Sequence, residues 1–196
     1  RGGGSPRGAF SLQGCVEPHR AHVEALGAQF REVRQKKDFT GIAALILPGG
    51  ESTTIGNLMQ RHGLDTKIIQ RHRQGMAVYG TCAGAILLAK EIIGSGQPSL
   101  NLLDISVRRN DYGRQADSFE TELDVEGVGK FKGIFIRAPV IENAGSSVRI
   151  LSDFHGKPVL VQKGSILAST FHPELTQDAR VHEHFIKMAN EYSQLL

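Results

Sequence analysis

A run of apolar residues at positions 42–47 is followed at once by the turn sequence PGG at 48–50. A continuous apolar stretch of this length is typical of a strand that is buried on both faces, as in a parallel sheet. A second short apolar strand is expected at 76–79, before GTCAG at 80–84, and helix-forming residues follow each turn. Strands that alternate with helices in this way predict an α/β fold with a central, mostly parallel sheet flanked by helices.

The remaining pattern fits a single three-layer α/β domain. Helices are expected at 17–26, with Gly27 as C-cap, at 85–91 and at 178–196, and further strands at 133–136, 148–151, 159–162 and 166–171. The last helix carries an apolar face formed by Val181, Phe185, Met188, Ala189 and Tyr192. Either Ser52 or Thr53 is expected to cap the helix that follows the PGG turn. The domain is predicted to cover residues 9–196, without a linker or internal repeat.

Composition excludes two broad classes of function. The chain has 196 residues, of which 40% are hydrophobic and 22% charged, as in ordinary soluble globular proteins. Its net charge is only +3 and aromatic residues make up 6%, so the sequence has no stacking platform for nucleic acid. No apolar run approaches the roughly 18 residues that a membrane-spanning helix requires.

Two cysteines, Cys15 and Cys82, are too few for a disulfide scaffold in a chain of this length. Both thiols are therefore expected to be free, which favours a reducing, cytoplasmic location. The opening residues, RGGGSPRG at 1–8, have no apolar pattern and are predicted to form a disordered leader outside the domain.

The segment GTCAG at 80–84 has the form of a nucleophile elbow, with Cys82 at the position of the nucleophile. Gly80 and Gly84 have no Cβ and so relieve the crowding of a sharp strand-to-helix turn. Such a turn raises the sulfur above the carboxyl edge of the sheet, and the start of the next helix favours the thiolate. A small buried cysteine in a tight turn is the alternative, but the strand–turn–helix context favours a nucleophile. Cys15 lacks this context and is expected to be a packing residue.

A thiolate nucleophile needs a base that later protonates the leaving amine, and a group that orients the base. His172 directly follows the strand expected at 166–171, and Glu174 comes two residues later, after Pro173. One ring nitrogen could then face the sulfur while the other binds the carboxylate. Taken alone, the same residues fit a solvated strand end equally well. The other histidines lie in polar or helical surroundings and are expected to be exposed: His19, His22, His62, His72, His155, His182 and His184.

The PGG turn at 48–50 can supply the N–H donors that an oxyanion requires. It follows a buried strand and opens a helix, so its amides can converge on one point, and its glycines allow a peptide to flip. An ordinary strand-to-helix turn is the alternative. A phosphate site is disfavoured because Glu51 would repel the anion and no Gly-Lys-Ser/Thr sequence follows.

The order of a glycine-rich turn, a cysteine elbow and His-Pro-Glu resembles the class I, triad-type glutamine amidotransferases, which have a flavodoxin-like fold. Within this class the chain is most similar to the glutaminase subunit of pyridoxal 5′-phosphate synthase. The resemblance extends from about residue 13 to the C-terminus. The segments that carry it are PGGESTT at 48–54, GTCAG at 80–84, RNDYGRQ at 109–115, SFE at 118–120, FIRAP at 135–139 and FHPELT at 171–176.

The resemblance implies that Cys82 attacks the side-chain amide of L-glutamine, that His172 moves the protons and that Glu174 orients His172. It also implies no metal and no cofactor. The residues that it implies for the glutamine site are Gly50, Glu51, Ser52, Arg109, Ile136 and Arg137, and the expected oxyanion donors are the amides of Gly49, Gly50 and Ala83. Arg109 or Arg137 could bind the carboxylate of the substrate, although either residue could equally form a surface salt bridge.

In this family the ammonia passes to a separate, barrel-shaped synthase subunit within a large hetero-oligomer. The resemblance implies low activity without this partner, whose docking completes the oxyanion hole. Gln13 and Gly14 match the interface loop near that hole. The preceding residues, PRGAFS at 6–11, contain a proline and strand-weakening residues where the family has an apolar strand, and this argues against a normal strand there.

Two other functions fit parts of the sequence. A stand-alone cysteine hydrolase of similar architecture would use the same triad but would leave the arginine-bearing segments without a role. A non-catalytic subunit would retain the fold without turnover, and the intact Cys82, His172 and Glu174 argue against it.

Overall fold

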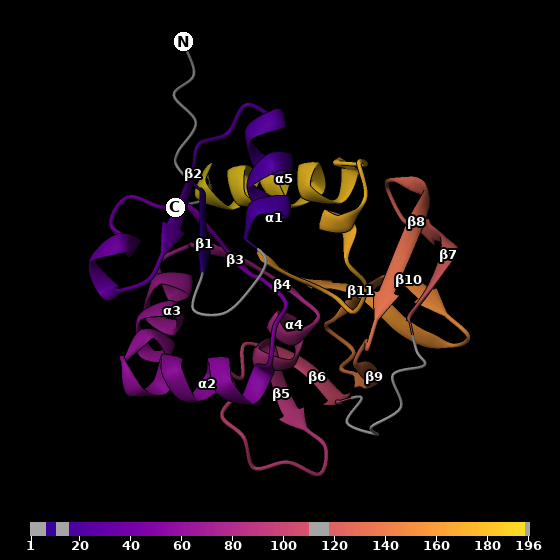
Figure 1. Ribbon diagram of the computed structural model, residues 1–196, viewed down its shortest axis with the longest axis horizontal. Helices are drawn as coiled ribbons and strands as arrows, with labels where there is room; N and C mark the ends of the chain where they lie inside the picture. Colours follow the sequence, from indigo (N-terminus) through magenta and orange to yellow (C-terminus); the bar gives the residue numbers. More distant parts are fainter. Residues whose placement is uncertain (1–6, 11–15, 110–117, 195–196) are drawn as a thin grey trace.

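A seven-stranded sheet forms the centre of the molecule in the computed structural model, which describes residues 7–10, 16–109 and 118–194 (Figure 1). The strand order is β10-β11-β12-β4-β3-β1-β2. Five neighbouring strands, from β12 to β2, run parallel, and β10 and β11 extend the sheet in antiparallel pairing. The strands of this sheet are β1 (Arg7–Phe10), β2 (Phe30–Val33), β3 (Ala44–Leu47), β4 (Ala77–Thr81), β10 (Arg149–Phe154), β11 (Lys157–Lys163) and β12 (Ile166–Ser169).

Helices cover both faces of this sheet, as Figure 1 shows, so the expected three-layer α/β domain is confirmed. Helices α1 (Glu17–Ala25) and α5 (Arg180–Gln194) pack on one face. Helices α2 (Ser52–Arg61), α3 (Leu64–Arg73) and α4 (Ala83–Leu88) pack on the other. Two 3-10 helices, η1 (Lys36–Phe39) and η2 (Pro173–Leu175), complete the helical elements.

The apolar side chains of β3 point alternately toward the helices on the two faces of the sheet. Leu45 and Leu47 pack with α2, α3 and α4, whereas Ala44 and Ile46 pack with α1 and α5. All four residues are at most 1% exposed. Side chains of a strand alternate between its faces, so a strand between two helical layers is apolar at every position.

Two smaller β structures lie beside the main sheet (Figure 1). Strands β5 (Ala89–Ile92), β6 (Leu103–Arg108) and β9 (Val140–Ala144) form a three-stranded sheet, and β7 (Ser118–Val125) pairs with β8 (Gly129–Ile136) as a hairpin. The helix expected at 85–91 is therefore wrong in its last part, because α4 ends at Leu88 and the chain enters β5. The parallel pairing of β5 with β6 overrides the helix propensity of these residues.

The N-cap of α2 is Glu51, and the expected caps Ser52 and Thr53 are wrong. The Glu51 carboxylate accepts hydrogen bonds from the backbone N–H groups of Thr53, at 3.3 Å, and Thr54, at 2.6 Å. Glu51 has an extended backbone, with φ −93° and ψ 111°, so its side chain can reach back over the first turn.

Residues 7–10 do form a strand, which corrects the expectation from the composition of this segment. Strand β1 pairs in parallel with β2 on one side and with β3 on the other. It includes Arg7 and Gly8, so these two residues belong to the sheet and not to a leader. Strand propensity depends strongly on context, and neighbours on both sides supply the backbone hydrogen bonds that the weak local sequence does not favour.

The helices in the described residues include none that has both the length and the apolar character of a membrane-spanning segment.

Candidate active site

Three neighbouring parallel strands end at the candidate active site. Strand β4 lies between β3 and β12, with Gly80 opposite Leu47 and Thr81 opposite Ser169. The carboxyl ends of parallel strands meet at one edge of a sheet, which is where ligands bind in open α/β folds. The PGG turn follows β3, Cys82 follows β4 and His172 follows β12, so the sheet brings the three sequence motifs to the same edge.

Cys82 lies in a strained turn between β4 and α4. Its φ is +54°, a value that side chains with a Cβ rarely adopt, and strain of this kind is common at functional positions. A Cβ on Gly84 would be 2.0 Å from the Leu47 carbonyl oxygen, and one on Gly80 would be 2.5 Å from the Gly84 backbone. Both glycines are therefore required by close backbone contacts. The thiol itself is free and half-buried, as a nucleophile must be to meet a substrate.

His172 and Glu174 form a buried pair. The His172 Nδ1 and Glu174 Oε1 atoms are 2.5 Å apart, and the two residues are 9% and 6% exposed. Pro173 opens the single turn η2, which folds Glu174 back toward the imidazole. The His172 backbone N–H also donates to the Ile134 carbonyl of β8 at 2.8 Å, so the hairpin fixes the other side of this segment.

The positive charge of protonated His172 and the negative charge of the Glu174 carboxylate stabilise each other. Burial alone would lower the pKa of His172, but the neighbouring Cys82 and Glu174 side chains outweigh burial and raise this pKa to about 10. Burial would likewise raise the pKa of Glu174, but the hydrogen bond with His172 and the nearby His19 lower it. At neutral pH the arrangement therefore favours an imidazolium beside a carboxylate, and an imidazolium can protonate a leaving amine.

The PGG turn reaches the triad through Gly49. A Cβ built on Gly49 would be 3.2 Å from His172 Cε1 and 3.8 Å from Cys82 Cβ, so all three residues meet around one point. Gly50 has φ +151°, a region that favours glycine. Ala83 begins α4 next to Cys82. Of the expected oxyanion residues, Gly49 thus lies beside the nucleophile, Ala83 follows it in the chain, and Gly50 follows Gly49.

Part of the expected glutamine site gathers at the start of α2. Arg109 contacts Thr53 and lies 3.9 Å from Glu51, and its Nη1 is 2.5 Å from Gln97 Oε1. Gln97 in turn donates to the buried Ser52 hydroxyl at 3.1 Å. Gln97 was not predicted from the sequence, because it lies in the irregular stretch after β5 and belongs to no motif.

Ile136 and Arg137 lie at the end of β8, on the hairpin side of the site. Ile136 is 39% exposed and Arg137 is exposed with φ +45°. Because strand residues rise by about 3.3 Å each, Ile136 lies within about 7 Å of Ile134, the residue bound to the His172 backbone. The two groups of expected glutamine-binding residues are therefore carried by different elements around the triad.

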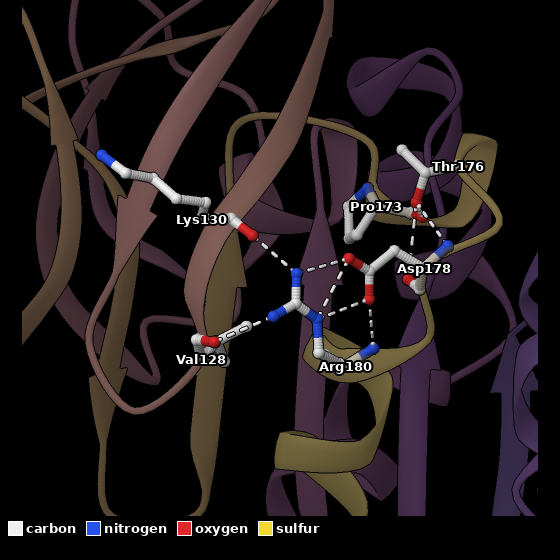
Figure 2. Close-up of polar contacts among 6 residues, drawn as sticks. All are labelled: Val128, Lys130, Pro173, Thr176, Asp178 and Arg180. Atoms are coloured by element: carbon white, nitrogen blue, oxygen red, sulfur yellow. Dashed lines mark hydrogen bonds and ion pairs between the residues drawn. The ribbon is translucent and has the colours of Figure 1, made fainter.

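Arg180 holds the segment that follows Glu174 against the hairpin, as Figure 2 shows. Its guanidinium donates to the carbonyls of Val128, at 2.9 Å, and Lys130, at 2.6 Å, and also binds the Asp178 carboxylate. The backbone of Asp178 is bound in turn to the Thr176 hydroxyl. These contacts connect the start of α5, the turn that carries Glu174 and the β7–β8 hairpin.

Three histidines that were expected to be exposed are buried behind the triad. His19, His22 and His182 are 0%, 7% and 1% exposed, whereas His62 and His155 are exposed as expected, and His72 and His184 are half-buried. The expectation for the first three is wrong because α1 and α5 turn these side chains toward each other beneath the sheet edge. The signal in the sequence was the position of His19 between Val16 and Val23 on the buried face of α1.

Gln13, Gly14 and Cys15 lie outside the described residues, as do residues 1–6 of the expected leader and residues 110–117 of the RNDYGRQ segment. The predictions made for them stay predictions.

Comparison with known proteins agrees with this geometry. The model of the SNO glutamine amidotransferase family matches residues 9–191. A relative from Thermus thermophilus, named pyridoxal 5′-phosphate synthase subunit PdxT, is 50% identical over 184 residues, which are 93% of this chain and 96% of the relative. A protein of the same name from Deinococcus radiodurans is 48% identical over 190 residues, with 94% and 97% covered.

Solved structures give the same picture. A crystal structure described as a glutamine amidotransferase is 49% identical, with a TM-score of 0.89 over 93% of this chain and 98% of the other. A structure of PurLQS from Thermotoga maritima is only 17% identical, with a TM-score of 0.64 over 96% of this chain and 97% of the other. The latter likeness shows the shared fold alone.

Proposed function

Because the chain belongs to the SNO glutamine amidotransferase family, we propose that it is the glutaminase subunit of a pyridoxal 5′-phosphate synthase. It hydrolyses L-glutamine to glutamate and ammonia and supplies the ammonia to a separate synthase subunit. The observation that carries this proposal is the convergence of Cys82, His172 and Gly49 at one point, with Glu174 bound behind His172. Relatives of nearly equal length that are named PdxT support it.

The reaction begins at Cys82. The thiolate sulfur attacks the side-chain amide carbon of glutamine, and the carbonyl oxygen becomes an oxyanion. When this intermediate collapses, the C–N bond breaks and His172 gives its proton to the departing nitrogen, which leaves as ammonia. A glutamyl thioester of Cys82 stays behind. His172, now neutral, takes a proton from water, and the resulting hydroxide attacks the thioester to release glutamate and the thiolate.

Glu174 keeps His172 in the correct orientation during both steps. Its carboxylate binds Nδ1 at 2.5 Å, which leaves Nε2 to exchange protons with the reacting groups. The negative charge also stabilises the imidazolium, consistent with the raised pKa of His172. An orienting carboxylate of this kind contributes less than the group that transfers the proton.

The amides of Gly49, Gly50 and Ala83 are the proposed donors to the oxyanion. The φ of +151° at Gly50 gives this turn a backbone conformation that only glycine adopts readily, so a peptide flip there costs little. We propose that partner docking, through the loop that contains Gln13 and Gly14, sets the turn in its donating state. This coupling would keep glutamine hydrolysis low when no acceptor for ammonia is present.

Glutamine is a zwitterion, so its site needs cationic donors and anionic or carbonyl acceptors. Arg109 is the proposed partner of the α-carboxylate, because Thr53 and Gln97 hold it beside the start of α2. Glu51 and Ser52 complete this side, and Ile136 and Arg137 close the other. The partner is proposed to be a barrel-shaped subunit in a large hetero-oligomer, in the cytoplasm.

Glutamate release from glutamine, measured with and without a purified synthase subunit, tests the proposal. Hydrolysis should be low for the chain alone and should rise when the synthase is added. An alkylating glutamine analogue should label Cys82 and abolish activity, and glutamine should protect against labelling. A chain that hydrolyses other amides but not glutamine, at a rate that the synthase does not change, would be a stand-alone cysteine hydrolase. A chain that neither hydrolyses nor is labelled would be a non-catalytic subunit.

A further inference from the structure

The second carboxylate oxygen of Glu174 is buried without a hydrogen bond. Oε1 binds His172, but Oε2 has no hydrogen-bond partner in residues 7–10, 16–109 and 118–194. An unpaired carboxylate oxygen in a buried position is costly, so the groups that face it bear directly on the stability of the carboxylate. One such group is the ring nitrogen Nε2 of His19, which lies 3.9 Å from Oε2.

His19 is fully buried and lies between the two segments of the active site. On one side its Nε2 faces Glu174, and on the other it lies 3.4 Å from the hydroxyl of Thr81, the residue before Cys82. Two groups joined through a water molecule are about 4.5 Å apart or more, given two ordinary hydrogen bonds. At 3.9 Å, which is longer than a hydrogen bond but too short for a bridging water, the imidazole and the carboxylate face each other directly.

The contact of His19 with His182 allows two arrangements of the ring protons, and the surroundings of the two rings favour one of them. A neutral imidazole has one N–H, so the 2.9 Å contact between His19 Nδ1 and His182 Nε2 has one donor and one acceptor. If His19 were the donor, His182 Nδ1 would carry an N–H, yet this buried atom has no partner in the described part of the chain. His19 Nε2 would also turn a lone pair toward the carboxylate.

The opposite assignment removes both problems. His182 then donates from Nε2 to His19 Nδ1, and only a lone pair of His182 stays unpaired, which costs less than a buried N–H. His19 in turn carries its proton on Nε2, where it faces both the Thr81 hydroxyl oxygen, at 3.4 Å, and Glu174 Oε2, at 3.9 Å. His22 does not supply a partner for His182 Nδ1, because its ring stacks on His182 at 4.6 Å while its own Nε2 donates to the Thr176 carbonyl at 2.8 Å.

Both rings are neutral at neutral pH. Burial lowers the pKa of His19 to about 4, although the nearby Glu174 opposes this shift, and His172 and His22 add to it. Burial also lowers the pKa of His182, and the neighbouring His19 and His22 act in the same direction. A neutral donor stabilises the Glu174 charge without cancelling it, which leaves that charge available to His172.

We propose that His19 is a positioning residue for Glu174: its Nε2–H, oriented by His182, stabilises the charge on Oε2 across 3.9 Å and so keeps Oε1 bound to His172. This inference rests on the proposed function for its kinetic test. His19 acts through Glu174 and does not touch the substrate. The catalytic device is thus a chain of five groups, in the order Cys82, His172, Glu174, His19 and His182, which joins the sheet edge to α1 and α5.

The kinetic test compares variants of His19 in the glutaminase–synthase complex. His19→Leu should lower kcat by about tenfold or more, the scale known from metal sites when a group that orients a ligating histidine is lost, and should leave KM unchanged. His184→Leu is the matched control on α5, since His184 is half-buried and binds Gln162, away from the triad; it should keep wild-type kinetics. In a Glu174→Gln background, His19→Leu should cause no further loss. An equal loss in both backgrounds would overturn the proposal.

Two further variants keep the test decisive if His19→Leu is poorly folded. The amide nitrogen of Gln lies near the position of Nε2 in histidine, whereas that of Asn lies near Nδ1. His19→Gln should therefore recover most of kcat, and His19→Asn should not. Equal activity of the two variants would contradict a donor role toward Glu174.

A measurement without substrate separates this inference from the proposed function. The proton in the 2.5 Å contact between His172 and Glu174 should give a strongly downfield ¹H NMR signal. His19→Leu should shift or broaden this signal, and His184→Leu should leave it unchanged. A signal identical in wild type and His19→Leu would overturn the positioning role. If the signal responds but glutamine is not hydrolysed, only the proposed function fails.

Discussion

Thr81 and Ser169 are direct partners in the parallel register of β4 and β12. Cys82 is the next residue after Thr81, and its backbone N–H continues the ladder by donating to the Ser169 carbonyl at 2.9 Å. His172 follows Ser169 by three residues. One strand pairing therefore sets the relative positions of the nucleophile and its base.

Replacing the nucleophile should abolish glutamine hydrolysis. Cys82→Ala removes the sulfur but retains a Cβ, so the strained turn and the surface for the synthase are kept. We expect activity to fall about a thousandfold or more, the scale seen when a covalent nucleophile is lost. Glutamate release measures the loss, and sedimentation of the complex with the synthase is the control for folding. Near-wild-type hydrolysis would remove Cys82 from its proposed role.

The two other members of the triad should differ in severity. His172→Ala removes the group that transfers the proton in both steps, whereas Glu174→Ala removes only its orientation and charge. We expect Glu174→Ala to retain about tenfold more activity than His172→Ala, or a larger excess. The comparison uses kcat in the complex with the synthase. The reverse ranking would show that the two roles are assigned wrongly.

Hydrolysis should fall as pH rises through about 10. Cys82 and Glu174 outweigh the effect of burial and raise the pKa of His172 to about 10, so the proton donor is present up to that pH and is lost above it. Glu174→Gln removes a charge that raises this pKa, and the alkaline limb of the kcat/KM profile should move to lower pH. The profile of kcat/KM from pH 6 to about 11 measures the alkaline limb in the wild type and in the variant. An alkaline limb that is unaffected by Glu174→Gln would contradict the coupling.

Acid should destabilise the fold through the buried histidines. The pKa of His19 falls from 6.5 in the unfolded chain to about 4 in the folded state, because burial disfavours the charged ring. The unfolded state therefore binds more protons between these values, and the stabilising effect is present above pH 6.5 and is lost as pH falls toward 4. The effect is on the order of 3 kcal/mol, since one pKa unit corresponds to about 1.4 kcal/mol.

Urea unfolding between pH 4 and 7 measures this dependence. His19→Leu should flatten the slope of the unfolding free energy against pH, although His182 retains a shift in the same direction. His62→Leu, at an exposed position, should keep the wild-type slope. A His19→Leu slope equal to that of wild type would show that His19 is not buried in its neutral form.

The elbow should not tolerate a methyl group at Gly84. Its Cβ would be 2.0 Å from the Leu47 carbonyl oxygen, so β3 and α4 would have to move apart. Gly84→Ala should destabilise the protein by at least about 1–3 kcal/mol, as overpacking does in well-packed interiors. Gly96→Ala is the matched control, because nothing lies within 4 Å of its Cβ and it should be nearly neutral. Thermal unfolding compares the two, and equal melting temperatures would contradict the close approach.

The local chemistry of this protein was readable from its sequence. Continuous apolar strands, helix-forming stretches and the glycines around Cys82 are local patterns, because side-chain period and backbone crowding act over a few residues. They predicted the layered α/β fold, the order of its main elements, and the residues Cys82, His172 and Glu174. The structure brings these three residues to one edge of the sheet, as the elbow pattern indicated.

Only the tertiary structure decided which distant segments meet. Strand β1 forms because β2 and β3 pair with it on both sides, although its own residues disfavour a strand. His19 and His182 are far apart in the chain and read as surface residues, yet the packing of α1 against α5 buries them behind Glu174. Burial and long-range hydrogen bonds depend on neighbours that the fold supplies, and for this reason a local pattern of polar residues could not reveal the support of the triad.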